Sequence, residues 1–271
     1  MTVIGRPNRL REIIGDGRTA AGLSCALDSP QIAEEFARSG VDFVYLDQQH
    51  GMISRDSMTQ MVRAIETSGA TALVRVAGND HALIGQALDA GAHGVIVPMV
   101  ENAEQATAAV DACRYSPDGH RSWGPIRSIN GLGSDPEWVN SQVLCMVMIE
   151  STTALANLAA ILDVPGVDGV YIGPADLAIS LGLPPLSHGQ SRDPEHHAAM
   201  RQILTACRER GLIAGISGDP VDLAAEGYQL VTAGLDIAML RSTLAGTRLA
   251  GAVTAPVPAP KEPNPTERTP A

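Results

Sequence analysis

The chain is almost without lysine: Lys261 is the only one among its 271 residues, and the other basic side chains are arginines. An enzyme that activates a carbonyl substrate as a Schiff base needs a buried lysine of lowered pKa. Lys261 lies in a terminal stretch rich in proline, so the expected folded region offers no such amine. Any carbonyl chemistry of this chain would therefore have to rely on a metal ion.

Other absences exclude further classes. No apolar run is long enough to span a membrane, and the polar residues 1–14 do not resemble a signal peptide. The net charge of −11 disfavours a nucleic-acid partner. The four cysteines are widely spaced and show no CxxC or Cys/His ligand pattern, which predicts reduced core residues of a cytoplasmic protein. They are Cys25, Cys113, Cys145 and Cys207.

What is present is a repeat in which a helix ends at a glycine, a short polar link follows, and an apolar strand begins. Glycine at such a position supplies the left-handed turn that reverses the chain. The expected strands lie at 23–27, 43–46, 72–74, 95–97, 143–149, 170–172, 213–214 and 230–231. Eight strands alternating with helices predict an α/β fold of the (β/α)8 TIM-barrel type. A doubly wound open sheet is the alternative, but no Gly-rich phosphate fingerprint follows the first strand.

The same pattern sets the domain boundaries. A hydrophobic fraction of 45% can fill one large core, so residues 1–252 are expected to form a single barrel. Residues 253–271 are dominated by Pro, Ala, Thr and Glu, which predicts a disordered tail. Ser29-Pro30 and Asp193-Pro194 are typical helix starts. His196 and His197, just inside the second of these helices, could look like a metal cluster, but neighbouring helical residues point about 100° apart and are poor co-ligands. They are interpreted as a solvated helix start.

Polar residues cluster where the expected strands end, the position of the active site in α/β barrels. At the ends of the expected strands these residues are Asp47, Gln49, His50, Arg75, Glu150, Asp176 and Ser217. Asp89 stands at the end of the third expected helix. Each has an ordinary alternative. Asp176 could cap a helix expected from Leu177, Glu150 could be a solvated loop acid, and Arg75 could simply pair with Asp47. Their joint convergence on one barrel mouth favours a site.

The residue types at this mouth fit one chemistry. Two carboxylates, Glu150 and Asp176, suit a hard cation such as Mg²⁺ or Mn²⁺. Such a cation would chelate a 2-oxo acid and stabilise the enolate formed when a proton leaves C3. Arg75 would hold the keto oxygen of the 2-oxo acid as negative charge develops on it. His50 is a candidate base. The backbone N–H groups of Ala175 and Asp176 suit the substrate carboxylate.

These residues stand in motifs that resemble the HpcH/HpaI aldolases, the metal-dependent pyruvate aldolases, over about residues 22–250. The motifs are Leu46-Asp47-x-x-His50-Gly51, Val74-Arg75-Val76, Leu88-Asp89-x-Gly91-Ala92, Pro98-Met99-Val100, Arg114-Tyr115-x-Pro117-x-Gly119-x-Arg121, Ile149-Glu150 and Gly173-Pro174-Ala175-Asp176-Leu177. The resemblance implies a barrel of the phosphoenolpyruvate/pyruvate-domain type. It also implies a homohexamer built from dimers that exchange the last helix.

For the site, the resemblance implies reversible cleavage of a 4-hydroxy-2-oxo acid to pyruvate and an aldehyde. Glu150 and Asp176 would hold Mg²⁺ or Mn²⁺, with Co²⁺ or Zn²⁺ as alternatives. His50 would be the base, made more basic by Asp89, and Arg75 would stabilise the transition state. The donor would be bound by Gly173, Ala175, Asp176 and Ser217.

Two positions depart from the family pattern. Gln49 stands where the family often has Glu, and Met148 stands where it often has Gln, so the donor could be a related 2-oxo acid such as hydroxypyruvate. Asp47, Gln49, Met148 and the loop residues Arg121 and Trp123 are candidate acceptor contacts. For the loop, an oligomer contact or a lid anchor is the alternative. For the whole chain, the alternatives are an acyl-CoA lyase of the citrate-lyase-like type and a catalytically retired oligomeric barrel.

Overall fold

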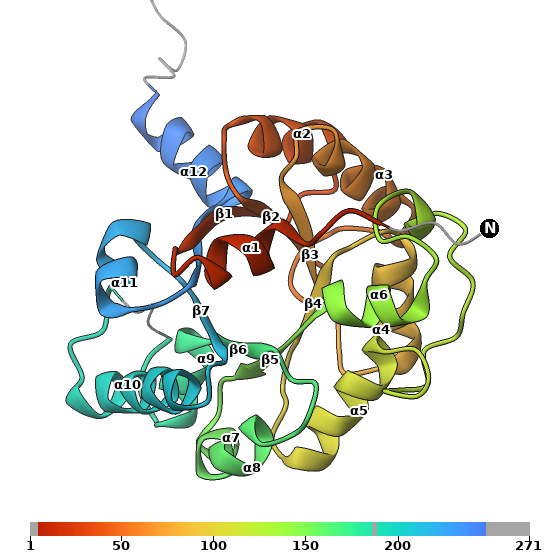
Figure 1. Cartoon of the computed structure of the whole chain (residues 1–271). Coiled ribbons are helices and arrows are strands. Elements are labelled where there is room, and N and C mark those ends of the chain that lie inside the picture. Colours follow the sequence, from red (N-terminus) through yellow and green to blue (C-terminus); the bar gives the residue numbers. More distant parts are fainter. Residues whose placement is uncertain (1–4, 186–188, 248–271) are drawn as a thin grey trace, which may run out of the picture.

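The computed structural model describes residues 5–185 and 189–247. Eight parallel strands close into a barrel in sequence order, and helices surround it (Figure 1). The strands are β1 (Ala20–Cys25), β2 (Phe43–Asp47), β3 (Thr71–Arg75), β4 (Gly94–Val97), β5 (Leu144–Ile149), β6 (Gly169–Ile172), β7 (Ile213–Ser217) and β8 (Leu230–Leu235). The (β/α)8 prediction is confirmed, and each expected strand overlaps an observed one. The tail predicted at 253–271 lies outside the described residues.

The helices alternate with the strands, with a few additions. They are α1 (Arg9–Gly15), α2 (Pro30–Arg38), α3 (Arg55–Glu66), α4 (His81–Asp89), α5 (Ala103–Cys113), α6 (Pro136–Gln142), α7 (Thr152–Ala156), α8 (Leu158–Leu162), α9 (Pro174–Ser180), α10 (Pro194–Glu209), α11 (Pro220–Glu226) and α12 (Asp236–Gly246). Helix α1 lies across one end of the barrel, whereas α12 projects away from it (Figure 1). Leu10 and Ile13 of α1 are buried and join the apolar cluster inside the barrel, so α1 closes its N-terminal end.

Two apolar clusters hold the fold together. The larger one packs the outward faces of the strands against the surrounding helices. The smaller one fills the barrel interior with inward-facing side chains such as Phe43, Leu73, Ile96 and Leu144. Inward and outward positions alternate along each strand, so residues two apart share the interior. This alternation brings Tyr45 and Asp47, or Met148 and Glu150, to the same side of the strand.

Two predicted boundaries were wrong. The first strand was expected at 23–27 but runs from Ala20 to Cys25, because the N–H groups of Ala26 and Leu27 donate to the Asp236 carboxylate instead of continuing the ladder. The helix after β6 was expected from Leu177 but begins at Pro174. Asp176 therefore lies within its first turn and is not its cap.

The helix starts were predicted correctly, but the histidines were not. The side chains of Ser29 and Asp193 cap α2 and α10, each followed by proline. His196, expected in solvent, is fully buried. Its Nε2 lies 2.8 Å from the carbonyl oxygen of Pro174, so this nitrogen donates a hydrogen bond to the first residue of α9. His196 is buried because it lies on the face of α10 that packs against α9.

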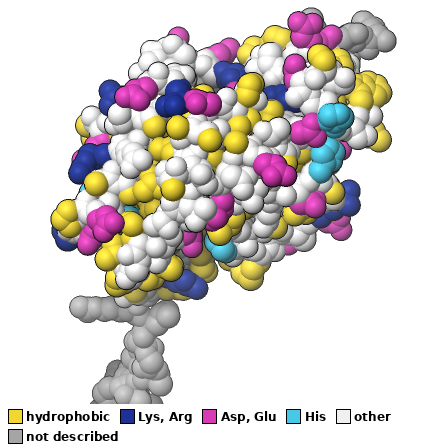
Figure 2. All heavy atoms as spheres, turned by 90° about the horizontal axis from the view of Figure 1, so that it is seen from below, with side chains coloured by type: hydrophobic (Ala, Val, Ile, Leu, Met, Phe, Trp, Pro, Cys, Tyr) yellow, Lys and Arg dark blue, Asp and Glu magenta, His cyan; other side chains and the backbone are white. Residues whose placement is uncertain are grey.

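The four cysteines are free and buried, as predicted. On the face drawn in Figure 2, arginine and acidic side chains are interspersed among apolar ones. Within residues 5–185 and 189–247, none of the helices combines the length and apolarity that crossing a membrane requires.

Candidate active site

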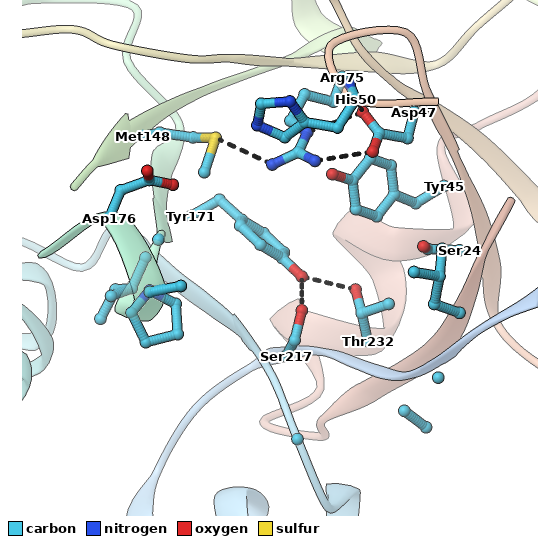
Figure 3. A pocket seen from close by; sticks show the side chains of 18 residues that line it. Ser24, Tyr45, Asp47, His50, Arg75, Met148, Tyr171, Asp176, Ser217 and Thr232 are labelled. Atoms are coloured by element: carbon cyan, nitrogen blue, oxygen red, sulfur yellow. Dashed lines mark hydrogen bonds and ion pairs between the residues drawn. The ribbon is translucent and has the colours of Figure 1, made fainter. Parts of the chain in front are cut away.

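A cavity of about 450 Å³ opens at the C-terminal ends of the strands. Eight of the predicted site residues line it: Asp47, His50, Arg75, Met148, Gly173, Ala175, Asp176 and Ser217. Figure 3 shows the charged and sulfur-bearing side chains on one side of this cavity and a group of hydroxyls on the other. The strand-end clustering therefore corresponds to a physical pocket.

Arg75 and Asp47 form a bidentate pair at the wall of this cavity. Nε and Nη2 of Arg75 donate to the two carboxylate oxygens of Asp47 at 3.0 and 2.7 Å. Burial alone would lower the pKa of Arg75, but the hydrogen bonds and charge of Asp47 outweigh it and hold that pKa above its ordinary value. Oδ1 of Asp47 also accepts the backbone N–H groups of Gln49 and His50 at 3.0 and 3.3 Å. One carboxylate thus orients both the guanidinium and the loop that carries His50.

Glu150 lies beside the cavity, directly after β5, and only 3% of its surface is exposed. Its Oε1 accepts a 2.7 Å hydrogen bond from the backbone N–H of Met99. Met99 has a φ of 56°, in the left-handed region that is unfavourable for residues with a Cβ. A Cβ at Gly173 would lie 2.6 Å from Oε2 of Glu150, so glycine is required where the chain passes this carboxylate. The carboxylate is therefore confined from two sides.

The donor set fits a divalent cation. Burial raises the pKa of Glu150; the Met99 N–H opposes this, and the nearby charge of Asp176 raises it further. A cation between the two acids would remove that repulsion. No group of three or more His, Cys, Asp or Glu side chains in the described part of the chain could hold a metal. A cation at this position would thus rest on two carboxylates and complete its shell with water and substrate, as Mg²⁺ commonly does.

The two departures from the family pattern lie in different environments. Met148 is buried and lines the cavity, and its sulfur lies 3.9 Å from Nη1 of Arg75. Gln49 does not line the cavity, and its side-chain oxygen is buried without a hydrogen-bond partner among the described residues. Of the two, only Met148 therefore faces the cavity.

Three predicted residues lie away from the pocket within a single chain. Asp89 ends α4, which leads to the N-terminal end of β4, opposite the cavity. It accepts a 2.9 Å hydrogen bond from Arg121, whose guanidinium also stacks 4.6 Å from the centre of the Tyr115 ring. Trp123 follows on the same loop and is 61% exposed. None of the three contacts His50 or lines the cavity.

Sequence reasoning missed four cavity residues that carry hydroxyls: Ser24, Tyr45, Tyr171 and Thr232. The period-two alternation of strands was the available signal, because Tyr45 and Tyr171 stand two residues before Asp47 and Gly173. The role of Met99 was also missed, since the sequence does not reveal a left-handed backbone at a methionine.

Comparisons with known proteins agree with this geometry. A family model described as HpcH/HpaI aldolase/citrate lyase matches residues 21–243. The chain belongs to this family. The HpcH/HpaI relatives include a hydroxypyruvate/pyruvate aldolase of Rhizorhabdus wittichii, 39% identical over 86% of this chain and 94% of the relative. A 4-hydroxy-2-oxovalerate aldolase of Rhodococcus jostii is 36% identical over 86% and 92%.

Solved structures agree. An HpcH/HpaI aldolase/citrate lyase family protein from Burkholderia cenocepacia has a TM-score of 0.77 and 30% identity, covering 88% of this chain and 97% of that one. As a member of the HpcH/HpaI family, the chain is a carbon–carbon lyase of the class II aldolase type, which uses a divalent metal ion.

Proposed function

We propose that this HpcH/HpaI aldolase reversibly cleaves a 4-hydroxy-2-oxo acid into an aldehyde and pyruvate, or a related 2-oxo acid such as hydroxypyruvate. The observation that supports it most is the pairing of a confined acid couple, Glu150 and Asp176, with the Arg75–Asp47 pair around one cavity. A cation held by Glu150 and Asp176 would supply Lewis-acid stabilisation of the enolate. We propose Mg²⁺ or Mn²⁺, because the donor set consists of oxygens only.

The residues have distinct roles in the cleavage direction. His50 takes the proton of the 4-hydroxyl group, the C3–C4 bond breaks, and its electron pair stays on the donor as the enolate while the aldehyde leaves. Return of a proton to C3 then gives the 2-oxo acid. The Arg75 guanidinium stabilises the negative charge on the C2 oxygen, and Asp47 keeps it oriented. The resemblance assigns the donor carboxylate to Gly173, Ala175 and Asp176, and adds Ser217 as a contact.

We also propose that the chain works as a homo-oligomer, a hexamer built from dimers, in the cytoplasm. Asp89 and its partner Arg121 lie at the end of the barrel opposite the cavity, so a second copy of the chain would be needed to bring them to a site. Exposed Met239 and Leu244 on the projecting helix α12 support the exchange of that helix between copies. The four buried free thiols suit a reducing compartment.

The runner-up functions have less support. An acyl-CoA lyase needs basic groups for a diphosphate, and the only arginine among the described residues that line the cavity, Arg75, is already paired with Asp47. A retired barrel would not be expected to keep a buried Glu150 next to Asp176, because burying a carboxylate beside another is unfavourable without a cation.

The test is pyruvate release from 4-hydroxy-2-oxo acids, measured in a coupled assay before and after EDTA treatment. We expect EDTA to abolish release and Mg²⁺ or Mn²⁺ to restore it. Glu150→Gln and Asp176→Asn should each lower kcat/KM by about a hundredfold or more, because charge stabilisation in the transition state is lost. They should also weaken Mn²⁺ binding measured directly by electron paramagnetic resonance.

Asp111→Asn is the matched control, because Asp111 pairs with His120 on the surface and lies outside the cavity. It should leave activity and Mn²⁺ binding unchanged. Release that survives EDTA, or an adduct of protein and substrate trapped by borohydride, would contradict the proposed mechanism. Cleavage of an acyl-CoA would instead favour the citrate-lyase-like alternative.

A further inference from the structure

One sector of the cavity is lined by hydroxyl groups, of which the proposed aldol chemistry uses only that of Ser217. They belong to Ser24, Tyr45, Tyr171, Ser217 and Thr232, from β1, β2, β6, β7 and β8, and are called the hydroxyl wall here. Figure 3 shows Tyr171, Ser217, Thr232 and Ser24 on the side of the cavity away from His50 and Arg75. The interior of an α/β barrel is usually filled by bulky apolar side chains, as it is here in the layers beneath. A polar layer at the mouth therefore needs an explanation.

The hydroxyl groups of the wall make only some of the hydrogen bonds that they could make within the protein. The Tyr171 hydroxyl lies 2.7 Å from Oγ of Ser217 and donates to Oγ1 of Thr232 at 2.8 Å. Tyr171 is thus saturated, but the hydrogen of Thr232 remains available. The hydroxyls of Ser24 and Tyr45 have no hydrogen-bond partner within residues 5–185 and 189–247, and neither is sealed from the cavity. Three hydroxyls therefore have unused bonding capacity toward the cavity.

The side chains of the wall are held in place by their neighbours, so the wall presents a preformed surface to a ligand. The Tyr45 and Tyr171 rings pack edge to face with centres 5.9 Å apart. The Arg75 guanidinium lies 5.5 Å from the centre of the Tyr45 ring, so the wall adjoins the reacting end of the cavity. A Cβ at Gly215 would lie 3.0 Å from the Tyr171 ring, so the barrel leaves only the room this tyrosine needs. Burial raises the pKa of both tyrosines, which keeps them protonated hydrogen-bond donors at neutral pH.

We infer that the hydroxyl wall is a subsite for aliphatic hydroxyl groups, so that this enzyme selects substrates hydroxylated beside the reacting carbons over their deoxy analogues. A deoxy chain would leave Thr232, Ser24 and Tyr45 facing an apolar group, which is costly for buried polar atoms. The inference rests on the proposed aldolase function. The hydroxyls can come from the acceptor, as in a 2,3-dihydroxyaldehyde, or from the donor, as in a 3-hydroxy-2-oxo acid. In both cases the group that the wall would bind is an aliphatic hydroxyl.

Two pairs of substrates of matched carbon number separate the sources. In the acceptor arm, kcat/KM is measured for D-glyceraldehyde and propanal with pyruvate as donor. In the donor arm, hydroxypyruvate and pyruvate are compared with one common aldehyde. We expect wild type to prefer the hydroxylated member in at least one arm by about tenfold. The variants Tyr45→Phe, Thr232→Val and Ser24→Ala should each reduce that preference by about three- to tenfold.

Tyr228→Phe and Thr71→Val are the matched controls. Tyr228 and Thr71 are also buried, but they lie at the opposite, N-terminal ends of β8 and β3. Both controls should keep the wild-type preference, and thermal unfolding monitored by circular dichroism checks that every variant is folded. Loss of preference in the acceptor arm or the donor arm alone identifies the source and supports the inference.

The two proposals fail in different ways. Aldol activity in which no wall variant alters either preference would overturn the hydroxyl wall and leave the proposed function intact. A folded, metal-loaded wild type that shows no aldol activity would overturn both.

Discussion

At the scale of single residues, the site depends on backbone conformations as much as on side chains. Met99 is the clearest case, because its left-handed backbone aims one N–H group at Oε1 of Glu150. An L residue in this conformation costs about 1–2 kcal/mol, whereas glycine adopts it readily. The strain is thus located beside a carboxylate that the mechanism requires, where a fixed orientation is useful.

Substitutions at Met99 separate strain from function. Met99→Gly keeps the N–H group and eases the left-handed backbone, so we expect unchanged Mn²⁺ affinity and a gain of up to about 1 kcal/mol in the free energy of unfolding. Met99→Val should displace this backbone, because β-branched residues avoid positive φ. Loss of the N–H bond should then weaken Mn²⁺ binding about tenfold, as for other groups that orient metal ligands.

Calorimetric Mn²⁺ titration and urea unfolding of the two Met99 variants provide the measurement. Equal metal affinity in the glycine and valine variants would show that the Met99 N–H does not orient Glu150. A valine variant with wild-type stability would show that the conformation is not under strain.

At the scale of elements, sequence patterns identified the strands but not their partners. Buried parallel strands are short apolar runs; six of them followed a helix-ending glycine, and the apolar runs at 23–27 and 143–149 completed the eight. The strand ends then indicated which polar residues share the barrel mouth. The contact of Met99 with Glu150 joins residues 51 apart, and that of Tyr171 with Thr232 joins residues 61 apart. Such contacts depend on tertiary placement, which local periodicity does not encode.

The pairing of α9 with α10 is another such contact, and it has a functional consequence. His196, at the start of α10, holds the carbonyl of Pro174, two residues before Asp176. His196→Phe keeps the ring and removes the hydrogen bond, so we expect a loss of about 1 kcal/mol in the free energy of unfolding. The first turn of α9 should also loosen, raising KM for the 2-oxo acid several-fold while kcat changes less.

Steady-state kinetics and urea unfolding test this role of His196. His197→Phe is the matched control: Nε2 of His197 lies 3.1 Å from the carbonyl oxygen of Ser191. It should not alter KM. If both variants raise KM equally, the effect comes from α10 as a whole and not from the bond to Pro174.

At the scale of the whole molecule, the two ends of the barrel have opposite characters. The C-terminal end holds a cavity with unused hydrogen-bonding groups, whereas the N-terminal end is closed by α1 and by paired charges such as Asp168 with Arg11 and Arg114. Substitutions can therefore change the chemistry without disturbing the fold at the C-terminal end of the barrel only, as is general for α/β barrels. The sequence could indicate the active end through its strand-end acids. It could not indicate which charges at the closed end are buried.

His93 belongs to the closed end and couples stability to pH. It precedes β4 and is 9% exposed. Burial, together with the positive charges of Arg6 and Arg127, lowers its pKa to about 4, against a backbone hydrogen bond at Gly91 that raises it. An unfolded histidine has a pKa of about 6.5. Between these values the unfolded chain binds a proton that the folded chain does not, so the free energy of unfolding falls as pH falls.

The His93 contribution is complete above pH of about 6.5 and is lost as pH falls to about 4, amounting to about 3 kcal/mol in all. Urea unfolding at a series of pH values across this window measures it. His93→Gln should unfold more easily at pH 7.5 but lose less stability than wild type on acidification, whereas His81→Gln, at an exposed helix start, should follow wild type. Carboxylates also titrate in this range, but they are common to all three proteins and cancel in the comparison. Parallel curves for wild type and His93→Gln would mean that His93 is protonated equally in both states, and the acid sensitivity of the barrel would then have to come from its carboxylates.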